Sequence, residues 1–570
     1  MDIRDYKKYV KYTLGKEKAD LVLKDANIIM VQTGEVLTAD IAIMDKYIVG
    51  IGDYEGVEEL DCSNKYISPG FVDSHLHFES TLANPRELVH YASLSGTTTF
   101  IADPHEAANV AGIKGINYIL DQTEDVSGDV YIMAPSCVPC KDGEDSGCIM
   151  GSQDLSQVLK ESRILGLGEV MDEDAVIGLN ENMMDKLELF GDRIIDGHLI
   201  SIEGKKLSAY AMSGIKTDHE STEYKYAMMK VRNGMYVHIR EGSAARNLEP
   251  IVKGIIENKT DISRFTFCTD DKHIEDIQRE GHISHNVRKA ISLGLDPIDA
   301  YKMATLNSAQ CYGLRDIGMI SVGKKANLIV IDDMEAVSID KVMYEGKFIS
   351  QDYVNSNKEV DTSLLNSINI DWFHKDMLAY KSHRHAIRMI EGEILTELID
   401  LDIYNEKRDL AKGPILGKKY KDISKVAVIE RHHNTGNYHV GKLLGYNIKN
   451  GAVASSVSHD SHNVIVVGDN DRDMMLAIEK LKELGGGYVL VEDGHVFDVL
   501  PLPVMGLISN LDSNIMNGIL SRMIEKAHQM GVPIGIEPFI ALSFIALPVI
   551  PEVRIRTRGL YDVLRDRYLD

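Results

Sequence analysis

The middle of the chain, residues 70–312, repeats one hydrophobic pattern. Apolar runs of strand length recur every 15 to 35 residues, and helical patterns lie between many of them. The eight runs are 70–73, 99–103, 130–134, 164–168, 193–197, 214–218, 235–239 and 265–270. Strands that alternate with helices predict βα units and a parallel sheet, and eight units in about 240 residues fit an α/β fold of the (β/α)₈ TIM-type barrel class. The alternative is an open doubly wound sheet, but no Gly-rich phosphate loop follows the first strand.

The flanking segments show a different, alternating pattern. Residues 20–68 alternate apolar and polar positions between Gly and Asp turns, which predicts short antiparallel strands. A second alternating stretch lies at 323–349. We therefore expect a small composite β-sandwich from residues 1–69 plus 313–351, with the barrel at 70–312 between them. The polar stretch 352–378 predicts a linker. Residues 379–570 predict a further C-terminal α/β or α+β domain, with a helix at 471–484 that ends at Gly485.

Composition excludes some classes of protein. Lys plus Arg is 62 and Asp plus Glu is 87, a formal net charge of −25, so we expect no nucleic-acid partner and no anionic membrane surface. The N-terminus lacks an apolar secretory signal, and the apolar stretch 539–550 is too short to span a bilayer and predicts a buried segment. Six cysteines, three of them at 137, 140 and 148, are too few for a disulfide framework, so we expect reduced structural thiols. We therefore expect a cytoplasmic protein.

Polar side chains with metal-ligating chemistry gather where the predicted strands end. In a barrel, the carboxyl ends of all strands face one mouth, which is where catalytic groups lie. Five strand ends supply four imidazoles and two carboxylates: His75, His77, Glu169, His198, His219 and Asp270. A single H-x-H pair is weak evidence, because a buried His is often satisfied by one hydrogen bond. The convergence of all five strand ends predicts a site for two divalent ions.

The same residues predict a reaction class. We expect His75, His77 and Asp270 to hold one ion and His198 and His219 the other, with Glu169 between them; Zn, Mn and Fe all accept such ligands. Divalent ions lower the pKa of bound water toward 7, and a neighbouring carboxylate, Asp270, can then carry the proton to a leaving group. The residues alone therefore predict metal-assisted hydrolysis.

At this point the chain resembles a known family. The stretch 69–77, Pro-Gly-Phe-Val-Asp-Ser-His-Leu-His, is similar to the amidohydrolase superfamily, and longer matches narrow the resemblance to the bacterial-type adenine deaminases. These matches are Phe71–Ser80, Ala102–Glu106, Gly168–Asp172, Asp196–His198, Thr217–Glu220, Ile239–Ser243, Cys268–His273 and Ser458–Asn463. The resemblance implies a metal-dependent barrel with a small sandwich. It also implies hydrolysis of adenine to hypoxanthine and ammonia with two Mn²⁺ or Fe²⁺ ions, Zn²⁺ being possible, and a preference for free adenine over adenosine.

Further polar strand ends supply candidates for substrate binding. Adenine offers both hydrogen-bond donors and acceptors, and the candidates that face it are Glu79, His105, Glu106, Arg240 and Asp271. Each has an ordinary alternative as a helix cap or a supporting hydrogen bond. Alternation along extended strands places Glu79 on the face of His77, and places Asp271 on the face opposite Asp270. Glu106 and His105 are the next candidates for the proton carrier after Asp270.

Two alternatives remain open. A hydrolase of cyclic amides often bridges its ions with a carboxylated Lys on strand 4, where this chain has Glu169. A metal-binding barrel that has lost catalysis would lack some of the six ligands. In the C-terminal domain, Glu430–His433 and His459–Asn463 form either a solvated turn, a metal cluster or a lid over the barrel mouth of its own or a neighbouring subunit. We expect a homo-oligomer, with a dimer as the working assumption.

Overall fold

The structure is a computed structural model that describes residues 3–200, 202–243, 245–353, 358–381, 384–401 and 423–569. Parts of the predicted linker and of the predicted C-terminal domain, residues 354–357, 382–383, 402–422 and 570, lie outside the described residues. In the described part of the chain, no helix combines the length and apolar character needed to cross a bilayer.

Eight parallel strands form the centre of the molecule. They are β6 (Phe71–Leu76), β7 (Thr97–Ala102), β8 (Asp129–Ala134), β9 (Ile164–Val170), β10 (Ile194–Gly197), β11 (Thr217–Asp218), β12 (Tyr236–Arg240) and β13 (Phe265–Cys268). The first five pair in the order β10-β9-β8-β7-β6 and the last three as β11-β12-β13. A parallel bridge from Leu76 to Asp270 joins β6 to the end of β13, and the amide of Lys216 donates to the carbonyl of Ile195 at the other junction.

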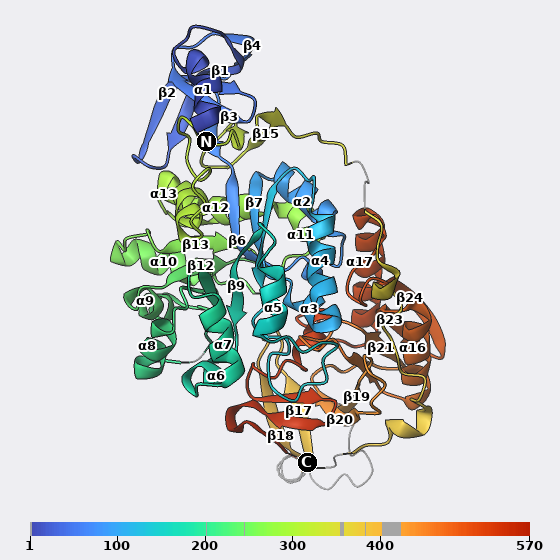
Figure 1. The fold of residues 1–570 in the computed structure, drawn as a ribbon. Coiled ribbons are helices and arrows are strands. Elements are labelled where there is room, and N and C mark those ends of the chain that lie inside the picture. The colour runs from blue at the N-terminus through green and yellow to red at the C-terminus, as the bar shows by residue number, and fades with distance from the viewer. Residues whose placement is uncertain are drawn as a thin grey trace.

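Helices follow most of these strands and cover them from outside (Figure 1). They are α2 (Pro85–Leu94), α3 (His105–Ala111), α4 (Ile113–Gln122), α5 (Ser152–Val158), α6 (Glu173–Ile177), α7 (Glu181–Leu189), α8 (Gly204–Met212), α9 (Tyr224–Arg232), α10 (Leu248–Asn258), α11 (Ile274–Glu280), α12 (Ile283–Ser292), α13 (Pro297–Lys302) and α14 (Ser308–Cys311). Helix α2 begins where the Asn84 side chain accepts from the amide of Arg86, with Pro85 in the first turn. Helix α10 buries Leu248, Ile251 and Ile255, whose spacing forms one apolar face.

Both flanks of the barrel contribute to one sheet at its amino-terminal end. The strand order is β16-β15-β14-β5-β1-β2-β3, and β4 also pairs with β1. The bounds are β1 (Ala19–Met30), β2 (Glu35–Met44), β3 (Tyr47–Gly52), β4 (Gly56–Asp61), β5 (Tyr66–Pro69), β14 (Leu328–Ile331), β15 (Ile339–Tyr344) and β16 (Lys347–Phe348), after helix α1 (Ile3–Thr13). The prediction of antiparallel strands is wrong for the pairing of β4 and β5 with β1, because both run parallel to it, whereas β5 pairs antiparallel with β14.

The C-terminal part builds a second eight-stranded sheet, in the order β18-β17-β20-β19-β22-β21-β23-β24. Its strands are β17 (His385–Met389), β18 (Thr396–Asp400), β19 (Ile423–Ile429), β20 (Tyr438–Leu444), β21 (Gly451–Ser455), β22 (Val464–Gly468), β23 (Gly487–Glu492) and β24 (His495–Pro501). Strands β25 (Val553–Arg556), β26 (Gly559–Asp562) and β27 (Arg567–Tyr568) form a separate three-stranded sheet, and the helices of this part are α16 (Asp471–Leu484), α17 (Ser513–Gln529) and α18 (Ile540–Phe544). The predicted helix 471–484 is confirmed, with Gly485 left-handed at its end.

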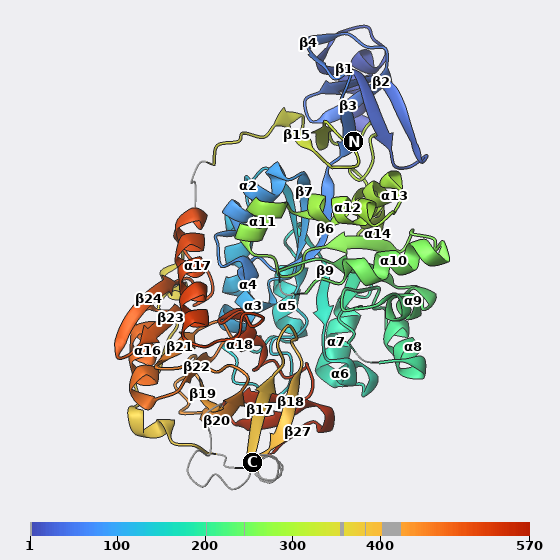
Figure 2. The same cartoon turned by 180° about the vertical axis from the view of Figure 1, so that it is seen from behind.

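The C-terminal elements lie against the barrel on the side away from the N-terminal sheet, with α17 alongside α11 (Figures 1 and 2). The segment predicted as a polar linker is in part packed: Ile368, Ile370 and Phe373 are buried in the core beneath the C-terminal sheet. The apolar stretch 539–550 is largely buried, as predicted, in an apolar cluster that contains side chains of both the barrel and the C-terminal sheet. One end of the barrel is therefore covered by the C-terminal unit.

Candidate metal centre at the barrel mouth

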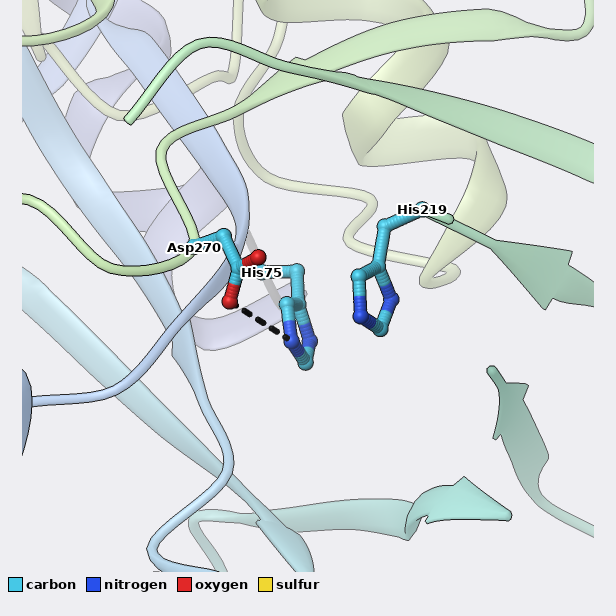
Figure 3. A group of neighbouring side chains, drawn as sticks. All are labelled: His75, His219 and Asp270. Carbon is cyan, nitrogen blue, oxygen red and sulfur yellow. Dashed lines mark ion pairs between the residues drawn. The ribbon is translucent and has the colours of Figure 1, made fainter. Parts of the chain in front are cut away.

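The predicted metal ligands stand where strands of the barrel end. Glu169 is the penultimate residue of β9, and Asp270 is two residues beyond β13. Three imidazoles each follow directly after a strand: His77, His198 and His219. His75 is inside β6. In Figure 3 the rings of His75 and His219 and the carboxylate of Asp270 converge from three separate segments, and the two rings stack with their centroids 4.0 Å apart. The structure thus brings together side chains that are up to 195 residues apart in the sequence.

Glu169 lies in the centre of this group, and its two oxygens face different imidazole pairs. Its Oε1 lies 3.4 Å from His77 Nε2 and 3.9 Å from His75 Nε2. Its Oε2 lies 2.7 Å from His198 Nδ1 and 3.2 Å from His219 Nε2. Asp270 Oδ1 lies 3.3 Å from His77 Nε2 and 3.9 Å from His75 Nε2. Six side chains thus contribute seven candidate ligand atoms, and the two oxygens of Glu169 face two different pairs of imidazoles.

The tautomers of this group fit a pair of divalent ions. His77 donates from Nδ1 to the carbonyl of Asp103 across 2.8 Å, so the lone pair of this imidazole is on Nε2. That Nε2 faces Nε2 of His75 at only 3.1 Å. Two carboxylates and four imidazoles, all buried or nearly so, converge here, and within each group of three the ligand atoms lie within 4.8 Å of one another. Such a donor set suits Mn, Fe or Zn.

Asp103 fixes the position of Glu169 through a hydrogen bond to its backbone. Its Oδ2 accepts a hydrogen bond of 2.8 Å from the backbone amide of Glu169. The preceding residue must be glycine, because a Cβ on Gly168 would lie 2.1 Å from that same oxygen. Asp103 also orients His77 through its carbonyl, as described above. One buried residue at the end of β7 therefore sets two of the six ligands.

Arg240 neutralises the acidic side of the group. Its Nη1 donates to Asp270 Oδ2 across 2.8 Å, and its two nitrogens form a bidentate pair with Glu220. Burial alone would raise the pKa of Asp270, but Arg240 and His77 hold that pKa well below its ordinary value. Glu220 was not among the predicted site residues, although it directly follows His219 and lies 3.4 Å from its Nε2. Its position directly after a candidate ligand is the sequence feature that could have identified Glu220.

Two residues depart from the predicted strand alternation. Asp270 adopts a left-handed backbone with φ 58°, so the chain is not extended there and Asp271 also lines the mouth. The alternation, which assumed an extended strand, therefore does not apply to Asp271, and this residue lies among the cavity residues as a substrate-binding candidate. Strand β6 ends at Leu76, and Glu79 opens a short 3₁₀ turn. Its Oε1 accepts from the amide of Ala107, and it is not among the residues that line the mouth cavity.

The mouth holds a cavity that both halves of the chain line. The barrel contributes His105, Glu106, Arg240 and Asp271 beside the metal ligands, as predicted for substrate binding. The C-terminal unit contributes an apolar wall and two polar side chains: Ile394, Phe544, Leu547, Ile550, His459 and Asp460. The lid interpretation of the C-terminal part is thus supported, and the lid comes from the same chain. His459 and Asp460 were noticed as a dense motif, but no residue pattern tied them to the barrel.

Comparison with known proteins agrees with this geometry. Residues 66–349 match the model of the amidohydrolase family, and residues 393–567 match that of the adenine deaminase C-terminal domain. The chain is 48% identical to an adenine deaminase of Desulfitobacterium hafniense, over 100% of this chain and 99% of that protein. Adenine deaminases of Clostridium acetobutylicum and Petrotoga mobilis are each 40% identical, over 98% and 96% of this chain and 99% and 96% of theirs. The chain therefore belongs to the adenine deaminase family of metal-dependent amidohydrolases.

Proposed function

We propose that this protein is a hydrolytic deaminase that converts adenine and water to hypoxanthine and ammonia. The observation that carries the proposal is the placement of Glu169, whose two oxygens face separate imidazole pairs at the end of a barrel that the adenine deaminase C-terminal domain covers. We propose that His75, His77 and Asp270 hold one divalent ion, that His198 and His219 hold a second, and that Glu169 bridges them. Mn²⁺ or Fe²⁺ is our proposed metal, with Zn²⁺ as the alternative.

Divalent ions in such a site lower the pKa of water, which makes hydroxide available near neutral pH. The overall reaction places the oxygen of water on C6 of adenine and releases the C6 amine as ammonia. The amine must gain a proton before it departs, because amide ion is too basic to leave at pH 7. We assign Asp270 as the carrier of that proton, since its carboxylate is next to the proposed metal ligands and Arg240 orients it through Oδ2.

The remaining polar groups of the cavity are proposed to orient the purine. Arg240 is committed to Asp270 and Glu220, so its role toward substrate is to hold those carboxylates in place. His105 lies 3.4 Å from Glu169 Oε1 through its Nδ1 and is next to the reacting centre. Glu106 and Asp271 are the carboxylates that can accept hydrogen bonds from the purine. Glu79, which accepts from the amide of Ala107 in the first turn of α3, is proposed to hold this turn in place rather than to touch substrate.

Metal analysis combined with an ammonia-release assay tests the function. Protein loaded with Mn²⁺ or Fe²⁺ should contain two ions per chain and release ammonia from adenine. Adenosine and cytosine serve as competing amines, and dihydrouracil tests the cyclic-amide alternative. Ammonia from cytosine alone, or ring opening of dihydrouracil with no deamination of adenine, would refute the proposal. Metal-loaded protein that turns over none of the four would instead identify an inactive barrel.

We also propose that the chain divides into a composite sandwich (1–69 plus 313–351), a barrel (70–312) and a C-terminal domain (379–570), and that it forms a homodimer. Limited proteolysis tests the division, because cleavage sites should fall at the boundaries. Sedimentation equilibrium tests the oligomer against a chain mass of 63.5 kDa.

A further inference from the structure

One loop of the C-terminal unit enters the barrel mouth. It joins β21 to β22 and is here called the mouth loop, residues 458–463. Its His459 and Asp460 line the same cavity as the proposed metal ligands. Asp460 Oδ1 lies 3.7 Å from Nε2 of His105, and His459 Nδ1 lies 3.1 Å from Oε1 of Glu106. The two units therefore meet at paired charges beside the reacting centre.

The mouth loop is held from several directions, so these contacts are built into the fold. Ser461 donates to Glu144 Oε2 across 2.6 Å, and Asn463 donates to the carbonyl of Asp145 across 2.9 Å; both acceptors belong to the barrel. From its own unit, His432 donates from Nε2 to the Ser461 carbonyl across 2.6 Å. The amide of His459 itself donates to the Ser543 carbonyl at 3.2 Å.

The ring of His459 is oriented by two neighbours. Phe544 stacks on one face, with centroids 4.8 Å apart and planes 23° apart. Glu106 takes the Nδ1 side, which leaves Nε2 as the polar atom of the ring that a ligand can reach. Within the described part of the chain, Nε2 has no hydrogen-bond partner. Burial disfavours the charged ring, but the carboxylates of Glu106 and Asp271 outweigh it and raise the pKa of His459 to about 9.

A third metal ion is the competing explanation of this cluster, because Glu106, His459 and His462 have suitable ligand atoms close together. His462 argues against it. Its Nδ1 accepts a hydrogen bond from the amide of Ser458 at 3.2 Å, so the proton of the neutral ring is on Nε2. Burial lowers the pKa of His462 to about 3, which keeps that ring neutral. The nitrogen that faces Glu106, at 3.9 Å, therefore has no lone pair for an ion.

We propose that His459 is a substrate-binding residue, which the C-terminal unit supplies to the barrel and which donates a hydrogen bond from Nε2 to an unprotonated ring nitrogen of the purine. Glu106 positions it by accepting from Nδ1. The proposal rests on the proposed deamination of adenine and adds a reason for the C-terminal unit. The barrel supplies the reacting groups, and the mouth loop contributes to recognition of the base.

Two substitutions separate the two nitrogens of the ring. In His459→Asn the amide nitrogen takes the place of Nδ1 and keeps the donor toward Glu106, but nothing replaces Nε2. In His459→Gln the amide nitrogen takes the place of Nε2. We expect the Asn variant to raise KM for adenine by at least about tenfold, the loss of one charge-assisted hydrogen bond, with a smaller change in kcat. The Gln variant should recover most of the loss. The exposed His495→Asn is the matched control and should leave both constants unchanged.

Competitive inhibition by 1-, 3- and 7-deazaadenine identifies the contact. In the wild type, one analogue should bind at least about tenfold more weakly than the other two, and His459→Asn should abolish that difference. An Asn variant with wild-type KM and an unchanged ranking of the three analogues would overturn the proposal. If the Asn variant does not fold, a tenfold rise of KM in a folded Gln variant would overturn it equally. Failure of the wild type to deaminate adenine is a separate result, which would refute the proposed function instead.

Discussion

Arg240 donates a hydrogen bond from Nη1 to Oδ2 of Asp270 across 2.8 Å, from the end of β12 to the segment after β13. The other oxygen of Asp270 faces His77 at 3.3 Å. One carboxylate thus has a fixed cation on one side and the metal ligands on the other. This arrangement keeps Asp270 ionised, as its proposed role as a ligand requires, and it limits the motion of the carboxylate.

Replacement of Asp270 by Asn should separate these two roles. The amide keeps an oxygen ligand but cannot carry a proton, so adenine turnover should fall by at least ~10², the lower range for general acid–base catalysis. Metal content should stay close to that of the wild type. Asp121→Asn, an exposed position, is the control. A variant with two ions and near-normal turnover would move the proton carrier elsewhere, with Glu106 or His105 next.

The bridging position of Glu169 predicts a loss of metal. Glu169→Gln preserves shape but replaces a charged bridge between two imidazole pairs with a neutral amide, which binds two cations poorly. Elemental analysis after dialysis should find fewer than two ions per chain. The exposed Glu188→Gln should keep its full content. Full metal occupancy in the Glu169 variant would show that the bridge is another group.

Arg240→Met tests the electrostatic support in metal-free protein. The substitution leaves the buried carboxylates of Asp270 and Glu220 without their cation, and breaking a buried ion pair costs roughly 3–5 kcal/mol. Urea unfolding in the presence of a chelator should show a drop of this size. The exposed Arg232→Met should change the free energy of unfolding little. Equal stability of both variants would mean that Arg240 contributes no net support.

A buried histidine outside the proposed set of metal ligands should make stability depend on pH. Burial lowers the pKa of His238 to about 3, and its Nε2 lies 3.0 Å from the Tyr312 hydroxyl. The unfolded chain protonates this ring below pH ~6.5 and the folded chain does not, so its contribution is complete above ~6.5 and is lost as the pH falls toward 3.

The test compares the free energy of unfolding at pH 7 and pH 5 in the wild type and in His238→Gln. The wild type should lose about 2 kcal/mol more than the variant over this interval. The comparison cancels the pH dependence of the metal ligands, because both proteins contain them. Parallel curves for the two proteins would show that His238 does not titrate as its burial implies.

Free adenine should be a better substrate than adenosine. The wall that the C-terminal unit adds to the cavity is apolar at Phe544, Leu547 and Ile550. A ribose against this wall would bury hydroxyls without partners, which costs roughly 1–3 kcal/mol for each. We expect kcat/KM for adenosine to be at least about tenfold lower. Comparable turnover of the nucleoside would contradict this account of the wall.

The sequence by itself determined the barrel and most of the candidate metal ligands. Strand periodicity identifies all eight strands, and the carboxyl ends of parallel strands share one mouth, so His75, His77, Glu169, His198 and His219 follow from local pattern alone. The physical reason is that extended strands repeat every two residues, which fixes the direction of a side chain without tertiary contacts.

Tertiary structure decided the positions of residues that lie beyond the ends of the strands. Alternation failed at Asp271, because Asp270 adopts a left-handed backbone, and at Glu79, because β6 ends at Leu76. His459 enters the mouth from 353 residues beyond Glu106, through a loop held by contacts with the barrel. Such contacts depend on how two units pack, and no repeat in the sequence encodes that packing. The candidate ligands of the barrel could therefore be predicted from local sequence. The residues that the C-terminal unit adds to the cavity could not.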